Sequence, residues 1–170
     1  MKRFLIAALL CSASTLSQAA DTQCLSNKYD AYIDASLTWY QDLIELTTQQ
    51  YPDLEEVGAW FYNGRKNHFE LNRGAVHYYL NEDMSKVSTE KPVEAWLQLE
   101  QIDIKNLASR DDELGKLASE SFSDRQSKPH AKNYELRSAF ADLLSHPNKI
   151  DDVLSKYNQA IIEAEEVNCL

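Results

Sequence analysis

Apolar residues recur at helical spacing along most of the chain, and charged residues take many of the positions between them. The longest such stretch runs from about Thr22 to Gln50 and predicts an amphipathic helix. Tyr51 and Pro52 end it, because proline disfavours a helical conformation in the residue before it. The predicted inward-facing stripe consists of Leu25, Tyr29, Tyr32, Ile33, Ser36, Tyr40, Leu43, Ile44 and Thr47.

The same spacing predicts five further helices, and glycine and proline, with four residues each, are scarce. Ser88 or Thr89 is expected to cap the third helix, and Ser109 and Asn148 to cap the fourth and sixth. Because the connections are short, neighbouring helices should be mostly antiparallel. The sequence therefore predicts an all-α fold, a single-domain bundle of five to six helices. The helices after the first are expected at about 52–81, 90–108, 110–122, 131–145 and 149–167.

The N-terminal segment has the layout of a secretory signal peptide. Lys2 and Arg3 precede an apolar run that is too short to span a bilayer, and small residues follow it. We expect cleavage after Ala19 or Ala20, which removes residues 1–20 and leaves residues 21–170 as one helical domain without a membrane span. A compact Sec-type signal favours the periplasm, with the extracellular space as the alternative.

Removal of the signal peptide leaves two cysteines, Cys24 and Cys169, near opposite ends of the mature chain. Two cysteines permit only one internal pairing, and an oxidising compartment favours it. Their separation does not match the Cys-x-x-Cys spacing that lowers a thiol pKa in redox pairs. The sequence therefore predicts a disulfide that joins the first helix to the last.

The mature chain is strongly acidic, because the signal peptide carries two of the 17 basic residues and none of the 27 acidic ones. The remaining formal charge of −12 argues against nucleic acid or an anionic membrane surface as a partner. It is compatible with a basic protein partner, and equally with a solvated acidic surface that keeps the domain soluble. A homo-oligomer stays open as an alternative.

The sequence contains none of the standard catalytic or cofactor motifs. Motifs for haem attachment, zinc proteases, phosphate loops and nucleophile elbows are absent, and no two histidines are three or four residues apart. Ser88 and Lys91 match a Ser-x-x-Lys spacing, but a helix cap also accounts for Ser88. We therefore expect no cofactor and no metal. Glu100, placed among apolar residues of the predicted third helix, is the best acid for a glycan hydrolase.

The predicted second helix holds the richest mixture of side chains, between residues 61 and 79. A helical projection gives it two apolar faces and one polar strip, which is typical of a helix at the centre of a bundle. In that interpretation His68 is a core residue hydrogen-bonded to Asn72 or to a tyrosine. Gly64 and Gly74 would then permit close approach of a neighbouring helix.

Two alternatives give this helix a binding role. An exposed aromatic and arginine strip would anchor a partner protein, and a pocket walled by aromatic residues would hold a small ligand. Exposure of Phe69 and Val76 would favour the first, and a cavity beside His68 would favour the second. The predicted partner-binding residues are Arg65, Phe69, Arg73 and Val76. The predicted ligand-pocket residues are Trp60, His68, Asn72 and Tyr79.

The sequence favours a non-enzymatic periplasmic domain that binds another protein, in an inhibitor, immunity-type or adaptor role. This expectation rests on the small size, the acidic charge and the lack of catalytic motifs. A helical bundle that binds a small ligand or a metal near His68 is the second hypothesis. A cell-wall or glycan hydrolase that uses Glu100, or a carboxylate near the predicted second helix, is the third.

Overall fold

The computed structural model describes the backbone of residues 14–169 and the side chains of residues 22–169. Within the described backbone there are six α-helices, three short 3-10 helices and no strand, so the predicted all-α fold is confirmed. The predicted signal peptide lies largely outside the described residues. The α-helices are α1 (Ser14–Gln50), α2 (Glu55–Glu82), α3 (Gln101–Leu107), α4 (Glu113–Gln126), α5 (Asn133–Leu144) and α6 (Pro147–Glu166). The 3-10 helices are Pro52–Leu54, Met84–Lys86 and Val93–Ala95.

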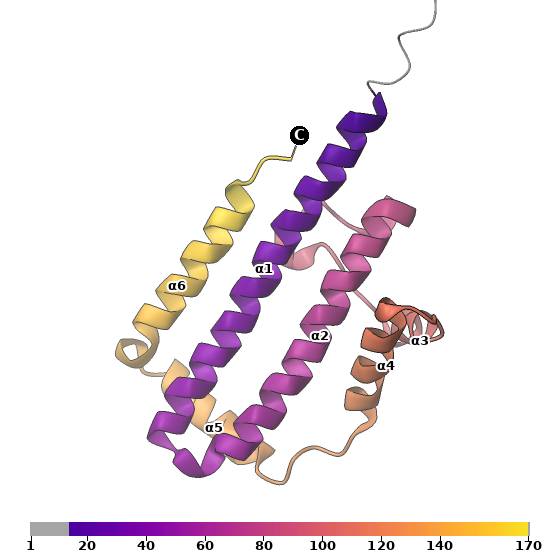
Figure 1. Ribbon diagram of the computed structural model, residues 1–170. Coiled ribbons are helices and arrows are strands. Elements are labelled where there is room, and N and C mark those ends of the chain that lie inside the picture. The colour runs from indigo at the N-terminus through magenta and orange to yellow at the C-terminus, as the bar shows by residue number, and fades with distance from the viewer. Residues whose placement is uncertain (1–13, 170) are drawn as a thin grey trace, which may run out of the picture.

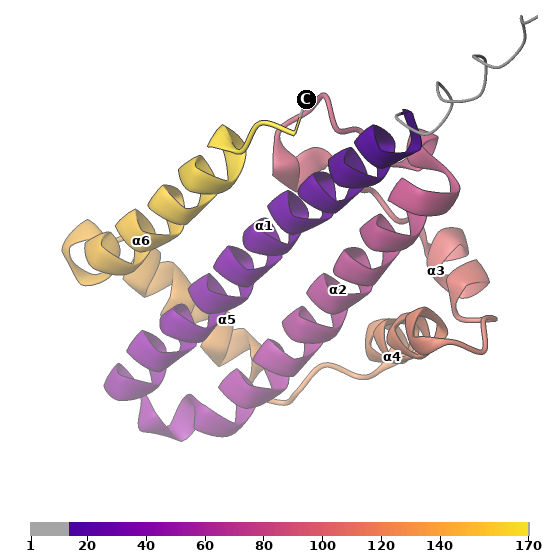
Figure 2. The ribbon, with the colours of Figure 1, turned by 45° about the horizontal axis from the view of Figure 1, so that its top comes forward.

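Helix α1 lies in the middle of the molecule, with α2 along one side and α6 along the other (Figure 1). Both neighbours run antiparallel to α1, as expected from the short connections. Helix α5 crosses near the end of α1 where α2 begins, and α3 and α4 lie beyond α2 (Figure 2). Among the described residues, none of the helices is both long and apolar enough to cross a membrane.

Two hydrophobic cores lie along α1. Tyr29 and Ile33, from the predicted stripe of α1, enter the first core, which also takes residues from α2, α3, α4 and the segment 87–97. Leu43, from the same stripe, enters the second core with residues of α2, α5 and α6. The regular stripe of α1 therefore places this helix at the centre of both cores.

The predicted third helix, 90–108, is wrong. Its first half is a 3-10 turn and extended chain, and only Gln101–Leu107 is α-helical. The Trp96 indole donates a hydrogen bond to the Lys91 carbonyl at 2.8 Å, and the Ser88 amide donates to the Trp96 carbonyl at 2.9 Å. These bonds fold the segment back on itself and bury Trp96 against Tyr29, with ring centroids 5.8 Å apart. Burial of this indole outweighs the local helical pattern.

Three of the predicted helix caps are also wrong. Ser88 and Thr89 lie in the turn before Trp96, and α4 is capped by Asp112, whose carboxylate accepts a hydrogen bond from the Gly115 amide at 3.0 Å. Ser109 lies upstream of that cap. Helix α6 begins at Pro147, ahead of the predicted cap at Asn148, because proline suits the first helical position.

The predicted disulfide between Cys24 and Cys169 is confirmed, with the two Cα atoms 5.5 Å apart. Lys28 holds the same end of α6: its amine donates to the Glu165 carbonyl at 2.9 Å and lies 3.2 Å from the Glu165 carboxylate. A cation beside the last carbonyls of a helix complements the helix dipole. The covalent and ionic contacts together fix the end of α6 against the start of α1.

Candidate functional site

The apolar residues of the predicted partner-binding strip on α2 are buried. Phe69 is 8% exposed and Val76 is fully buried, because α1 covers the first and the bundle core encloses the second. The condition for this interface, exposed apolar side chains beside Arg65 and Arg73, is therefore not met. The interpretation of α2 as a central helix accounts for both apolar residues.

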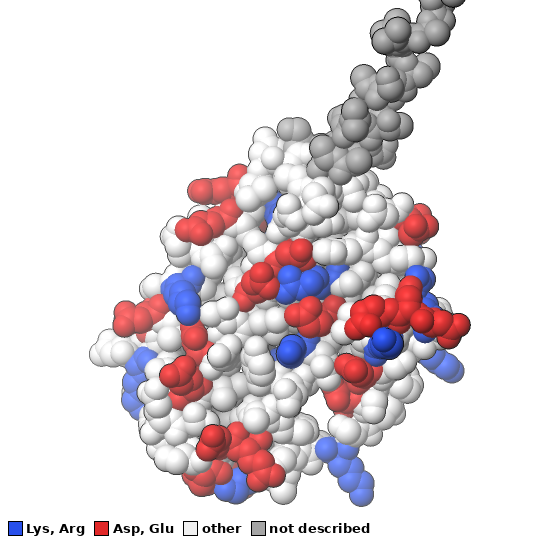
Figure 3. Space-filling view, viewed as in Figure 1, with Lys and Arg blue, Asp and Glu red and all other residues white. Residues whose placement is uncertain are grey.

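Arg73 belongs to an ionic network between α2 and α1. Its guanidinium contacts Asp30 at 3.2 Å, Asp34 at 2.5 Å and Glu70 at 3.0 Å, and His77 also contacts Asp30 at 2.8 Å. Burial opposes the charge of Arg73, but the hydrogen bond to Asp34 and the three carboxylate charges raise its pKa overall. Figure 3 shows basic atoms enclosed by acidic ones at the centre of the face that α1 and α2 form. Arg73 therefore joins two helices.

The predicted ligand-pocket residues do not share a cavity. Trp60 and Tyr79 stand near opposite ends of α2, and at 1.5 Å per residue they are roughly 28 Å apart along the helix axis. Trp60 lines a surface hollow with residues of α4 and α5, whereas Tyr79 packs against the first core. Residues on one helical face can lie several turns apart, so their shared face does not bring these residues side by side.

His68 is half-buried and contacts Asn72, the partner that the central-helix interpretation predicts. Its Nε2 atom lies 3.4 Å from the Asn72 amide nitrogen, and its ring packs on Phe69 with centroids 5.4 Å apart. Burial, together with the smaller effects of the positive charges of Arg125 and Arg65, lowers the pKa of His68 to about 4. The imidazole is therefore neutral at pH 7. Among residues 22–169, no three His, Cys, Asp or Glu side chains are grouped to hold a metal ion.

Glu100 is exposed, in contrast to the apolar setting that the hydrolase hypothesis required. It is the N-cap of α3, where its carboxylate and that of Asp103 form a reciprocal capping box. The Glu100 amide donates to Asp103 at 2.9 Å. Glu100 therefore has a structural role that its spacing from Trp96 and Ile104 did not predict.

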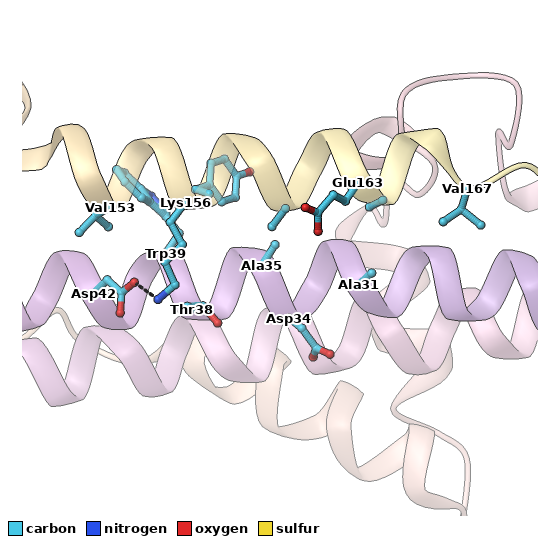
Figure 4. A pocket seen from close by; sticks show the side chains of 13 residues that line it. Ala31, Asp34, Ala35, Thr38, Trp39, Asp42, Val153, Lys156, Glu163 and Val167 are labelled. Atoms are coloured by element: carbon cyan, nitrogen blue, oxygen red, sulfur yellow. Dashed lines mark hydrogen bonds and ion pairs between the residues drawn. The ribbon is translucent and has the colours of Figure 1, made fainter.

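A groove of about 530 Å³ follows the line between α1 and α6 (Figure 4). Its floor is made of alanines one helical turn apart, Ala31 and Ala35 on α1 and Ala160 and Ala164 on α6. Towards one end of the groove Trp39 contacts Tyr157, with ring centroids 5.6 Å apart. The groove stays open because the alanine side chains of both helices are too small to fill the space between α1 and α6.

The polar groups of this groove are mostly acidic. Asp34, Asp42 and Glu163 line it, and its one lysine, Lys156, binds Asp42 at 2.7 Å across the two helices. Figure 4 shows the Glu163 carboxylate between α1 and α6, and the bond between Lys156 and Asp42. Asp34 is paired with Arg73 and Asp42 with Lys156, so Glu163 is the lining carboxylate without an ion pair among residues 22–169. The groove therefore combines an apolar floor with one uncompensated negative charge.

A second hollow, of about 260 Å³, lies where α2, α4 and α5 meet. Trp60, Phe61 and Gly64 of α2 form part of its wall. Its charged lining residues are Arg65, Asp124, Arg125 and Arg137. One residue of each predicted set, Arg65 and Trp60, thus reaches the same hollow.

Sequence reasoning missed both sites because each one joins residues from distant parts of the chain. The available signals were weak: Ala160 and Ala164 repeat at helical spacing on α6, and Arg125 and Arg137 are cations in an acidic chain. Neither signal predicts which residues of other helices lie next to these positions. No protein-family model, no curated protein and no solved structure matches this chain.

Proposed function

We propose that the mature chain is a non-enzymatic binding domain of the periplasm, and that the groove between α1 and α6 takes a basic amphipathic helix of a partner protein. The observation that carries the proposal is the pairing of an apolar alanine floor with acidic side chains in one elongated groove. An inhibitor, an immunity-type protein or an adaptor would use such a surface. Helices docked in hydrophobic grooves are a common mode of recognition.

The dimensions of the groove suit a helix. Its lining residues span Ala31 to Asp42 on α1 and Val153 to Val167, the residue after α6, which corresponds to roughly 17–21 Å of helix. That length accommodates about three turns of a third helix. Alanines allow a third backbone to approach within the 8–10 Å typical of packed helices. Trp39 and Tyr157 would provide an aromatic contact for the incoming apolar face.

The charge of the groove selects for a basic partner. Within residues 22–169 Glu163 forms no ion pair, and its carboxylate accepts a hydrogen bond from the Gln159 amide at 3.0 Å. Lys156 is already neutralised by Asp42. Complementary charges at an interface raise the association rate and reject partners of the same sign. Lysines or arginines flanking the apolar face of the partner helix would therefore strengthen binding.

The groove exists before any partner binds. Cys24 and Cys169 join the two helices covalently near one end, and Lys156 joins α6 to α1 within the groove. A preformed site loses less conformational entropy on binding. A groove held by these two ties is suited to binding a partner without a large conformational change.

The test is covalent capture of partners by the mature protein from its native periplasmic extract, compared across four variants. Ala160→Trp fills the groove, and Glu163→Lys reverses its charge. Ser155→Trp and Glu166→Lys are matched controls, since both positions are exposed on α6 and do not line the groove. We expect the wild type and both controls to capture one partner through a basic helical segment. Both groove variants should weaken binding of that segment, as a synthetic peptide, about tenfold or more.

Equal capture by all variants, capture through an acidic segment, or capture of nothing would each overturn the proposal. Native mass spectrometry adds a separate readout. A small molecule that stays bound to the wild type and is lost from Ala160→Trp would show that the groove holds a small ligand instead of a helix.

A further inference from the structure

The second hollow, between α2, α4 and α5, has a different chemistry from the groove. Its cations are Arg65 of α2, Arg125 in the last turn of α4, and Arg137 of α5. Asp124 is its only lining carboxylate, and that carboxylate accepts a hydrogen bond from the Asn67 amide at 2.8 Å. The charged lining of the hollow therefore carries a formal excess of two positive charges in a chain whose mature charge is −12.

The three arginines of the hollow are not neutralised within the protein. Among residues 22–169, the other two arginines, Arg73 and Arg110, both contact carboxylates at 2.5 Å. Within the same residues, no ion pair within 4.0 Å involves Arg65, Arg125 or Arg137.

Other contacts of these arginines leave their charge uncompensated. Arg65 lies over two aromatic rings, at 5.2 Å from the centroid of Phe61 and 5.5 Å from that of Tyr40. Arg137 donates only to the neutral Asn133 amide oxygen, at 3.3 Å. In a chain rich in acids, the gathering of the unpaired guanidiniums at one hollow indicates a site for an external anion.

Gly64 supplies an independent observation at the same place. A glycine inside a helix costs about 1 kcal/mol relative to alanine. Gly58 and Gly74 of the same helix have packing reasons, because a Cβ atom there would lie 2.9 Å from Ile44 and 3.3 Å from Leu114. A Cβ atom at Gly64 would meet no atom within 4 Å. Packing therefore does not require this glycine, whereas a larger side chain would reduce the hollow that it lines.

We propose that this hollow binds a phosphate monoester on a small molecule with an apolar or aromatic part. Guanidinium groups bind phosphate oxygens in bidentate pairs, and a monoester carries up to two negative charges, which match the excess charge of the lining. Trp60, at 36% exposure, and Phe61 provide the apolar wall. The volume of about 260 Å³ lies below the usual range for drug-sized ligands, so the ligand is small.

The experiment is calorimetric titration of the mature protein with phenyl phosphate at pH 7 and moderate salt, beside phenol and benzoate. Phenyl phosphate should bind, and phenol, which lacks the anion, should not. Benzoate should bind at least about tenfold more weakly, because one carboxylate cannot engage three guanidiniums. Benzoate binding as tight as phenyl phosphate, or no binding of phenyl phosphate, would overturn the phosphate assignment.

Variants then locate the site. Arg125→Gln and Arg137→Gln should each weaken phenyl phosphate binding about tenfold, and Lys128→Gln, an exposed position that does not line the hollow, should leave it unchanged. Gly64→Leu should abolish binding by filling the hollow. Ala59→Leu, an exposed small residue of the same helix, is its control. Loss of affinity in both controls, or none in the three hollow variants, would place the anion elsewhere.

Nuclear magnetic resonance of the His68 ring gives a readout that a merely structural change would not mimic. The charges of Arg125 and Arg65 contribute to the lowered pKa of His68, after the larger effect of burial. A bound phosphate offsets those charges, so it should raise the pKa of His68 in the wild type. An unchanged pKa at saturating phenyl phosphate would contradict binding at this hollow.

Discussion

The groove between α1 and α6 and the hollow between α2, α4 and α5 are opposites in composition. The groove has a floor of alanines, and its one cation, Lys156, is bound to Asp42. The hollow has aromatic walls, and its three cations have no carboxylate partner. The difference teaches that internal pairing, more than the number of charges, marks which charges are left for a ligand.

Among residues 22–169, two of the five arginines and five of the ten lysines follow the pattern of Lys156 and contact a carboxylate. Arg73, for example, contacts three carboxylates and joins α2 to α1. Such pairs are expected in a chain with 27 acidic and 17 basic residues, because acids outnumber cations. The hollow is distinctive because it gathers the three arginines that have no ion pair among residues 22–169. The following predictions test this contrast, beginning with the largest expected effect.

Removal of the disulfide should weaken binding in the groove and leave binding in the hollow intact. With both cysteines replaced, Cys24→Ser and Cys169→Ser, the loop-entropy argument predicts a loss on the order of 4–5 kcal/mol in the free energy of unfolding. Partner binding in the groove should weaken, because α6 loses its covalent tie to α1. Phenyl phosphate binding should persist where the domain stays folded, since the hollow contains neither cysteine. An unchanged melting temperature would show that the bridge adds no stability.

His68 should make stability depend on pH. Its folded pKa of about 4 lies below the unfolded value near 6.5, so the unfolded chain takes up the proton first as the pH falls. The His68 contribution is therefore lost between about pH 6.5 and pH 4, by about 2–3 kcal/mol from pH 7 to pH 4.5. Denaturant unfolding of wild type and His68→Gln at both pH values measures the difference.

The control for this measurement is His146→Gln, at an exposed histidine. It should keep the pH dependence of the wild type. A wild type and a His68→Gln variant that lose stability in parallel would mean that His68 is not the responsible group.

Paired and unpaired arginines should differ when each is neutralised. Arg73→Gln leaves Asp30, Asp34 and Glu70 without their shared cation, and we expect a loss of about 2 kcal/mol in unfolding free energy. Arg125→Gln should cost less than about 1 kcal/mol, because its structural role is limited to the dipole at the end of α4. If urea unfolding gives equal losses of unfolding free energy for the two variants, the paired and unpaired arginines do not differ in structural role.

The smallest predicted effect is a gain in stability. Gly64→Ala should raise the unfolding free energy by up to about 1 kcal/mol, because alanine favours the helix and meets no atom there. Gly58→Ala should lower it, because the new methyl group would meet Ile44. A loss of stability in Gly64→Ala would show that the glycine has a packing role after all.

Regular patterns along single helices were predictable, and folds of the chain back on itself were not. The stripe of α1 placed Tyr29, Ile33 and Leu43 in the cores correctly. The 90–108 segment has a similar apolar spacing, but its Trp96 finds a hydrogen-bond acceptor at Lys91 and a stacking surface on α1. Such tertiary contacts override local propensity.

The sequence by itself determined the helical class, the inward-facing stripe of α1, the central character of α2, the acidic charge and the identity of the bridged cysteines. These follow from periodicity, composition and the permitted pairings, which are properties of a linear chain. Only the tertiary structure decided that Phe69 and Val76 are covered, and that Arg65, Arg125 and Arg137 share one unneutralised hollow. Burial and charge pairing depend on distances between helices far apart in sequence, and those distances are set when the helices pack.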